Sequence, residues 1–254
     1  MRFVQAIIFT ILLSCNSKQE TKKAVDKADT IEITNNKISL VDEQNVDTSK
    51  TEIIEIFIDS LNIGEKGKCK MELIKHRVYD DNYVIIKFYI KGRNTIKDSE
   101  TWMIQNNYSY ETNAIMGLDP NISDFNNDNF NDITFISGTA ARGANEVRRL
   151  FIYDDQKREL ISIVNSQDYP NMLYNKELDC IDAFMVHGSS TTVFAKLSDD
   201  SLKTFATVQN SEDFHTINLI DNNGNERELY KVKSKGVYIR HKNFKPLIEY
   251  EDVK

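Results

Sequence analysis

Residues 71–90, MELIKHRVYDDNYVIIKFYI, contain two segments of alternating and β-branched residues separated by Asp80-Asp81. Alternation with a period of two places successive side chains on opposite faces of a strand, which buries one face and leaves the other in water. Aspartate favours tight turns because its side chain bonds to nearby backbone N–H groups. The stretch therefore predicts an antiparallel hairpin, with strands at 71–79 and 82–90.

The same pattern recurs along most of the chain. A second hairpin is predicted around Asp221-Asn222-Asn223-Gly224, because Asn and Gly tolerate positive φ. No helical pattern of useful length alternates with the strands, so parallel βαβ architectures are not expected. We predict an all-β fold, an antiparallel meander that is either β-propeller-like or a β-sandwich. Further strands are expected at 52–58, 101–105, 133–137, 149–153, 160–164, 191–197, 202–208, 216–220 and 228–232.

The amino terminus has the features of an export signal. Met1-Arg2 is positively charged, residues 3–13 are mostly apolar, and Leu12-Leu13-Ser14-Cys15 resembles the bacterial lipobox, in which the Cys is acylated and the chain is cleaved just before it. A buried helix with a chance Cys is the alternative, but the charged run from Lys18 gives it no amphipathic continuation. We expect a signal peptide at 1–14 and membrane attachment through a lipid on Cys15.

Composition divides the rest of the chain in two. Residues 16–50 are rich in Lys, Asp, Glu, Thr and Asn and contain no aromatic residue, Gly or Pro, so residues 15–50 are predicted to be a lipidated, disordered tether. Residues 51–254 are enough for one well-buried domain. Asn16 follows the Cys, whereas Asp at that place retains lipoproteins in the inner membrane under the familiar sorting rule. We therefore expect outer-membrane attachment.

Charge and cysteine content restrict the partners and the cross-links. The net charge of −7 is spread along the chain, which argues against nucleic acid and against anionic lipid heads as ligands. Cys69 and Cys180 remain after Cys15. In an exported protein they form either one disulfide or two free buried thiols, and their spacing does not suggest a zinc site.

Residues 124–132, DFNNDNFND, have the spacing of a calcium loop. Ca²⁺ takes six to eight oxygen ligands, and loop positions 1, 3, 5 and 7 converge on one point, the last through its backbone carbonyl. An EF-hand is excluded, because its twelfth position is Phe135 rather than Glu. Position 9 supplies a carboxylate instead, and three carboxylates so close together repel one another without a cation. An Asx-rich turn without metal is the alternative. The predicted ligands are Asp124, Asn126, Asp128, Phe130 and Asp132.

This loop, followed by a strand, resembles those of FG-GAP and VCBS-type β-propeller proteins. Those loops usually carry Gly at position 6, where this chain has Asn129, the next most tolerant residue of a left-handed turn. Residues 124–208 as a whole resemble a family of small periplasmic proteins with one VCBS-like loop. Some members are immunity proteins that block peptidoglycan-cleaving effectors, with a fold related to that of periplasmic lysozyme inhibitors.

The resemblance implies a partner-binding loop at residues 137–145, SGTAARGAN. Inhibitors of this kind insert a small, polar loop into the cleft of the enzyme. Gly and Ala permit close approach, and an Arg pairs with catalytic carboxylates. An ordinary surface connection is the alternative. The residues assigned to the contact are Ser137, Gly138, Thr139, Arg142 and Asn145.

Nothing in the sequence indicates an enzyme. The four His residues are isolated from one another, and no nucleophile elbow or phosphate-binding glycine loop is present. We therefore expect a binding protein with a protein partner in the envelope, such as a peptidoglycan hydrolase. The alternative is a calcium-stabilised module that binds a surface glycan or another protein.

Overall fold

The computed structural model describes residues 51–94 and 99–251. The predicted signal peptide, Cys15 and the tether lie outside these residues. Within them no helix is long and apolar enough to cross a membrane. The only helical turns described are two short 3-10 segments, η2 (Ala141–Gly143) and η3 (Ser166–Asp168).

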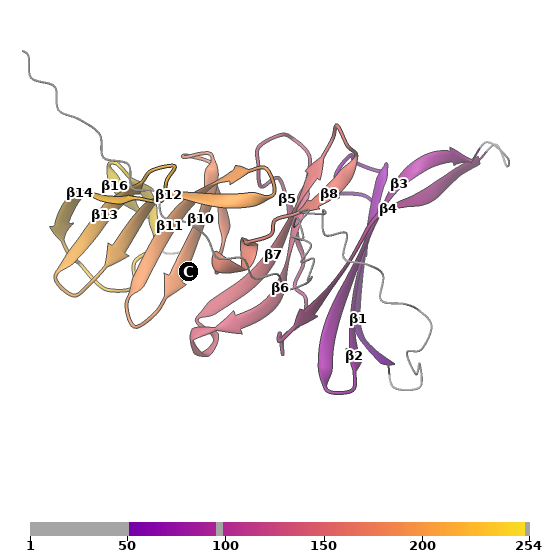
Figure 1. Ribbon diagram of the computed structural model, residues 1–254, viewed down its shortest axis with the longest axis horizontal. Helices are drawn as coiled ribbons and strands as arrows, with labels where there is room; N and C mark the ends of the chain where they lie inside the picture. The colour runs from indigo at the N-terminus through magenta and orange to yellow at the C-terminus, as the bar shows by residue number, and fades with distance from the viewer. Residues whose placement is uncertain (1–50, 95–98, 252–254) are drawn as a thin grey trace, which may run out of the picture. The chain divides into compact units, whose positions relative to one another are not determined.

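Strands make up the rest of the framework, arranged as successive meanders (Figure 1). The N-terminal sheet has the order β1-β2-β3-β4, the middle sheet β5-β6-β7-β8, and the C-terminal sheet β14-β13-β12-β11-β10-β9, with β15-β16 as a separate pair. Within each sheet, strands that are consecutive in the chain pair antiparallel, and no sheet closes on itself. The all-β antiparallel prediction is confirmed.

The strands of the first two sheets are β1 (Thr51–Asp59), β2 (Cys69–Val78), β3 (Asp81–Asn94), β4 (Ser99–Thr112), β5 (Asn121–Ser123), β6 (Asp132–Ala140), β7 (Asn145–Asp154) and β8 (Glu159–Ser162). The remaining strands are β9 (Leu173–Asn175), β10 (Cys180–Val186), β11 (Ser190–Ser198), β12 (Ser201–Asn210), β13 (Phe214–Ile220), β14 (Glu226–Lys233), β15 (His241–Phe244) and β16 (Leu247–Glu249).

Both predicted hairpins form. Val78 pairs with Asp81, so the β2–β3 turn consists of Tyr79 and Asp80, and Tyr79 has a left-handed φ of 56°. In the β13–β14 turn the Asp221 carboxylate accepts N–H bonds from Asn223 and Asn225, both at 2.9 Å. Side-chain turn bonds therefore hold the β13–β14 hairpin, whereas the β2–β3 turn lies one residue before the predicted Asp80-Asp81 pair.

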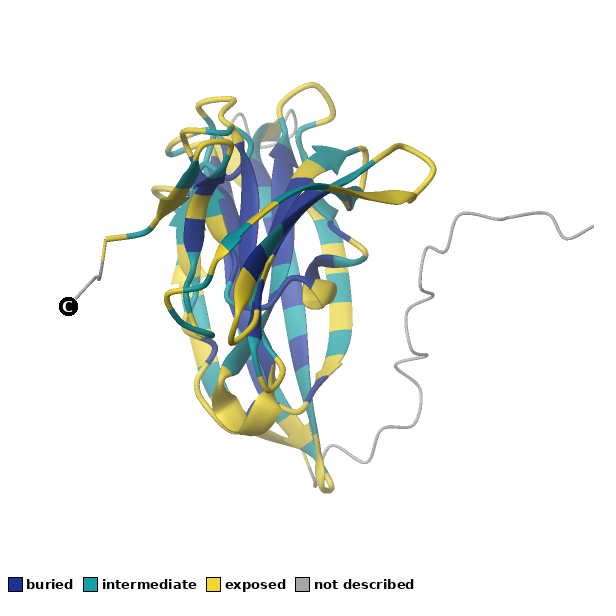
Figure 2. Cartoon of the chain, turned by 90° about the vertical axis from the view of Figure 1, so that its left-hand side faces the viewer, coloured by how far each residue is buried: buried dark blue, intermediate teal, exposed yellow. Residues whose placement is uncertain are grey.

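The sheets pack face to face, as in a sandwich. Along β7, Phe151 and Tyr153 belong to the core shared with the N-terminal sheet, whereas Leu150 and Ile152 belong to the core shared with the C-terminal sheet. Burial on both faces explains the unbroken apolar run of this strand. In Figure 2 the buried residues run along the inner strands, and the loop tips are exposed. The surfaces open to a partner are therefore the loops and the outermost strands.

Candidate functional site

The predicted calcium loop joins β5 to β6 and is organised around Asp124. The Asp124 carboxylate accepts backbone N–H bonds from Asn126 at 3.3 Å, Asp128 at 3.2 Å and Asn129 at 2.9 Å. Asn129 is left-handed, with φ of 72°, which is the conformation that position 6 of such a loop requires. Asn127 is left-handed too, with φ of 61°. The chain therefore follows the path expected of the loop, with Asn in place of Gly.

Asp132 closes the loop onto the neighbouring strand. Its side chain is fully buried, and its two oxygens accept N–H bonds at 2.8 Å, one from Phe125 and one from Tyr153 of β7. Burial raises the pKa of Asp132 to about 8, and the charges of Asp128 and Asp124 act in the same direction. The two amide bonds oppose this shift because they favour the ionised carboxylate.

The predicted ligands are only partly gathered. Asn126 Nδ2 donates to Asp128 Oδ2 at 2.8 Å, and both Asp124 and Asn126 accept the N–H of Asp128, so the residues at positions 1, 3 and 5 form one cluster. These are oxygen donors, the kind that Ca²⁺ takes. Asp132 instead points at backbone amides, and the ring of Phe130 packs on Tyr153 with centroids 5.5 Å apart. Within the described ranges, no three His, Cys, Asp or Glu side chains are grouped as a metal site.

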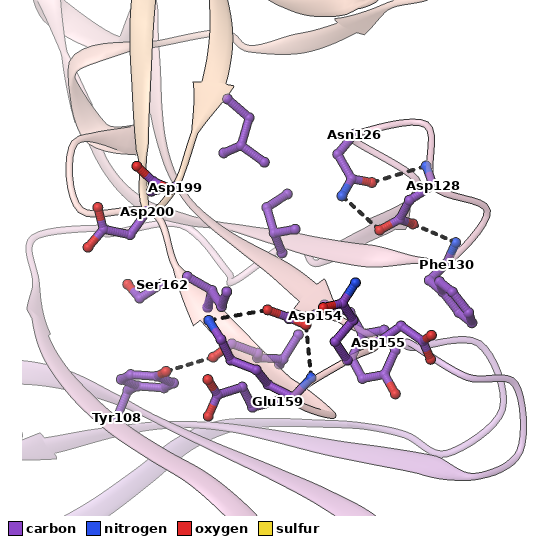
Figure 3. Close-up of a pocket in the computed structure, with 17 residues that line it drawn as sticks. Tyr108, Asn126, Asp128, Phe130, Asp154, Asp155, Glu159, Ser162, Asp199 and Asp200 are labelled. Atoms are coloured by element: carbon purple, nitrogen blue, oxygen red, sulfur yellow. Dashed lines mark hydrogen bonds and ion pairs between the residues drawn. The ribbon is translucent and has the colours of Figure 1, made fainter.

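An acidic groove of about 920 Å³ lies beside this loop (Figure 3). Asn126, Asp128 and Phe130 form part of its wall, together with Tyr108 of β4. Lys157 contributes a positive charge to the lining, and it pairs with Asp154 at 3.3 Å. The carboxylates that line the groove are Asp128, Asp154, Asp155, Glu159, Asp199 and Asp200. Their charge favours cationic groups and disfavours anionic ones.

The predicted partner-binding loop forms the tip of the β6–β7 hairpin. Residues 139–144 are all exposed. Ala141, Arg142 and Gly143 adopt consecutive left-handed conformations, with φ of 49°, 58° and 92°. For a residue with a side chain this costs about 1 kcal/mol or more, so the surrounding structure must impose it. We call residues 139–144 the hairpin tip.

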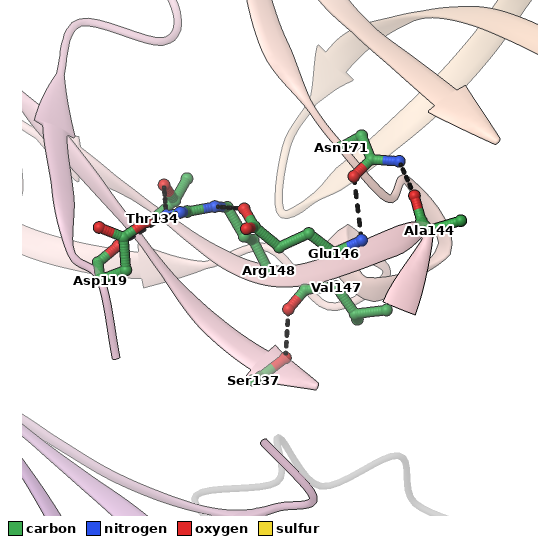
Figure 4. A network of polar contacts seen from close by, with 8 residues as sticks. All are labelled: Asp119, Thr134, Ser137, Ala144, Glu146, Val147, Arg148 and Asn171. Atoms are coloured by element: carbon green, nitrogen blue, oxygen red, sulfur yellow. Dashed lines mark hydrogen bonds and ion pairs between the residues drawn. The ribbon is translucent and has the colours of Figure 1, made fainter. Parts of the chain in front are cut away.

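The base of the hairpin tip is held by a polar network (Figure 4). Asn171 accepts the N–H of Glu146 at 2.9 Å and donates Nδ2 to Ala144 O at 3.0 Å and to Phe184 O at 2.8 Å. Arg148 is buried and pairs with Glu146 and Asp119, both at 2.5 Å. These bonds tie the hairpin to the C-terminal sheet and to the segment that precedes β5.

The structure divides the predicted contact residues into two groups. Thr139 and Arg142 are exposed on the hairpin tip, as a partner surface requires. Ser137 is buried, and its hydroxyl donates to Val147 O at 3.3 Å. Gly138 is also buried, under Asn113. Asn145 accepts the N–H of Val186 at 2.9 Å and donates to Val186 O at 3.0 Å, so it joins β7 to β10.

The placement of these three residues corrects part of the prediction. Ser137 and Gly138 are buried, and the amide of Asn145 is bonded to Val186, so these three residues support the hairpin tip rather than forming the contact surface. The calcium loop does not organise the tip either, because the two lie at opposite ends of β6, about 27 Å apart for an extended strand of this length. The network around Asn171 and Arg148 supports the hairpin tip instead, and no local sequence pattern predicted this network.

Of the two alternatives for the cysteines, the disulfide does not form. Cys69 and Cys180 are both free and buried. Cys69 belongs to the core between the N-terminal and middle sheets, whereas Cys180 packs with Phe194 in a separate core. Burial raises the pKa of both thiols, which keeps them protonated and unreactive. The two thiols are therefore core residues, which was the other alternative that the sequence left open.

Comparison with known proteins gives little further information. No family model matches the chain, and no curated protein sequence matches it. One solved structure, described as "Structure of a Xanthomonas Type IV Secretion System related protein", superimposes with a TM-score of 0.42 and 10% sequence identity. The superposition covers 68% of this chain and 93% of that chain. A likeness this distant does not bear on function.

Proposed function

We propose that this chain is a lipid-anchored binding protein of the cell envelope, and that it inhibits a peptidoglycan-cleaving enzyme by inserting the hairpin tip into the cleft of that enzyme. The observation that carries the proposal is the tip itself, residues 139–144. Its backbone is held in an unfavourable left-handed conformation, with the exposed Arg142 among small residues. Strain of this kind gathers at sites of function.

The chemistry of the hairpin tip suits such a cleft. Many glycosidases use a pair of carboxylic acids on either side of the bond that they cleave. A guanidinium binds a carboxylate through two parallel hydrogen bonds, which gives Arg142 both an attraction and a preferred orientation there. Ala140, Ala141, Gly143 and Ala144 leave the tip narrow. Because the network around Asn171 already orders the backbone, binding loses less entropy than it would with a mobile loop.

The test is an inhibition assay with the purified full chain. A panel of muramidases, lytic transglycosylases and amidases is presented with a peptidoglycan suspension, and the loss of turbidity is followed with and without the chain. We expect one enzyme class to be inhibited at a one-to-one ratio. If the chain neither inhibits nor binds any enzyme of the panel, the proposal is wrong.

We also propose that Ca²⁺ binds residues 124–132. The proposal is supported by the oxygen donors of Asp124, Asn126 and Asp128, which lie together in one loop. A ligand that binds only the folded state at 100 times its Kd stabilises it by about 2.7 kcal/mol. In scanning calorimetry Ca²⁺ should raise the Tm by a few degrees. Asp128→Ala should abolish the shift, whereas the exposed turn variant Asp221→Ala should keep it. An unchanged Tm of the wild type would refute the site.

The second candidate function, a glycan-binding module, would use the groove beside the calcium loop. Tyr108 and Phe130 offer rings for stacking on sugars. The acidic lining weighs against peptidoglycan as the ligand, because the stem peptides of peptidoglycan carry carboxylates and would be repelled. Binding of uncharged chito-oligosaccharides, lost in Tyr108→Ala, would favour this candidate over the inhibitor.

A further inference from the structure

The segment that follows β4 exposes two large apolar side chains. Ile115 is 97% exposed and Met116 is 60% exposed, whereas Ala114 and Leu118 on either side are 1% and 0% exposed. A single exposed apolar residue is ordinary on a protein surface, but an adjacent pair at the apex of a loop that is buried on both sides is not.

A buried charge holds this loop in place. Lys75 of β2 is 3% exposed, and its ammonium donates hydrogen bonds to Ala114 O at 2.8 Å and Met116 O at 2.7 Å. Burial lowers the pKa of Lys75, while the charge of Glu55 raises it. The Glu55 carboxylate also accepts the N–H of Leu118 at 2.8 Å. Burying an ammonium lowers the stability of the fold, and here the buried ammonium fixes the carbonyls on both sides of Ile115.

The same loop shares its base with the hairpin tip. Thr112 Oγ1 donates to Ser137 O at 2.7 Å and accepts the N–H of Ala114 at 3.1 Å. Asn113 lies directly over Gly138, because a Cβ added there would overlap Asn113 Oδ1. The two protrusions therefore rise from adjoining backbone, one carrying Ile115 and Met116 and the other carrying Arg142.

We infer that Ile115 and Met116 form the apolar anchor of the interface whose charged part is the hairpin tip, so that both protrusions contact the same protein partner. This inference rests on the proposed function. Interfaces concentrate their binding energy in a few desolvated apolar and arginine side chains, and both kinds are present here. A bilayer fits the loop less well, because the exposed acidic residue Glu111 precedes it in the chain and is repelled by anionic lipid.

The experiment measures the Kd of the full chain for the panel enzyme that the wild type inhibits. The double variant Ile115→Ala, Met116→Ala should bind about 30-fold more weakly and should keep the wild-type Tm, since both side chains are exposed. The matched control is Val164→Ala, because Val164 is also exposed, at 64%, and its N–H bonds to Asp200 O, away from both protrusions. That control should bind as the wild type does.

The outcomes separate this inference from the proposed function. If Arg142→Ala weakens binding and the double variant does not, the anchor is wrong and the inhibitor proposal stands. If neither variant changes the Kd, or if no enzyme of the panel binds, both are wrong. Two further results overturn the anchor: binding to phosphatidylcholine vesicles that the double variant loses, which assigns the loop to a bilayer, and dimerisation in sedimentation that it loses, which assigns the loop to a second copy.

Discussion

Replacing Asp182 by Ala should lower the free energy of unfolding by about 3 kcal/mol or more. Asp182 is fully buried in β10, and its carboxylate accepts bonds from Arg240 Nε at 2.8 Å, Asn175 Nδ2 at 3.1 Å and the hydroxyl of Tyr250. Removing it leaves the guanidinium of Arg240, only 19% exposed, without its counter-charge. The cost arises because the remaining charge stays desolvated, not because a buried ion pair is strongly stabilising in itself.

Urea denaturation of the wild type and of Asp182→Ala measures this difference. The control is Glu228→Ala, which removes an ion pair to Lys231 with both side chains about half exposed. Exposed pairs contribute about 1 kcal/mol or less, so this variant should unfold close to the wild type. A loss of under 1 kcal/mol in Asp182→Ala would contradict the argument that the Arg240 charge is left buried without its partner.

Acidification from pH 7 to pH 5 should cost the fold about 2 kcal/mol through His241 alone. His241 is fully buried, and its ring lies 5.2 Å from that of His215, which is 2% exposed. Burial, and after it the neighbouring His215, lowers the pKa of His241 from 6.5 to about 4. The unfolded chain therefore binds a proton between about pH 6.5 and pH 4 that the folded chain does not, and stability falls as the pH falls through this window.

The measurement is the free energy of unfolding at pH 7 and at pH 5. His241→Gln keeps a donor for Asn210 Oδ1, which accepts at 3.0 Å from the ring if Nε2 carries the proton, and it should lose less stability over this range than the wild type. His187→Gln, at an exposed position, should behave as the wild type does. Carboxylates with a lowered pKa, such as Asp59, act below this window. Asp132, whose pKa is raised to about 8, gains its proton as the pH falls and stabilises the fold to the same extent in every variant, so the assignment rests on the difference between variants. Equal changes in the wild type and His241→Gln would refute the assignment.

The sequence predicts the strands that alternate or carry clear turn residues, and it misses those that do not. The strand β10, CIDAFMV, begins with four residues buried on both faces of the C-terminal sheet, so it has no alternation to detect. Two other missed strands, β5 and β9, contain three residues each, too few for any period. Both hairpins were predictable, but only the turn at Asp221 was placed correctly, because Asp, Asn and Gly act locally there, whereas the first turn is shifted by one residue to Tyr79-Asp80.

In the candidate site, too, the features set by local sequence were predictable, and those set by contacts between distant residues were not. The path of residues 124–132 follows from the local preference of Asn for left-handed backbone. The support of the hairpin tip does not, because Arg148 and Asp119 are 29 positions apart, and Asn171 and Ala144 are 27 apart. Side-chain pairs at such separation leave no periodic signal. Ser137 is buried and Asn145 is engaged by Val186, which is the reason why only part of the predicted contact surface is exposed.

The Kd of Arg142→Ala for an inhibited enzyme tests most directly whether the hairpin tip binds the cleft of a peptidoglycan-cleaving enzyme. Arg142→Gly serves as the matched variant, because Gly accepts the left-handed φ of 58° without strain while it removes the same guanidinium. We expect both variants to bind about 30-fold or more weakly than the wild type, with an unchanged Tm. Binding by both variants at the wild-type Kd would contradict the claim.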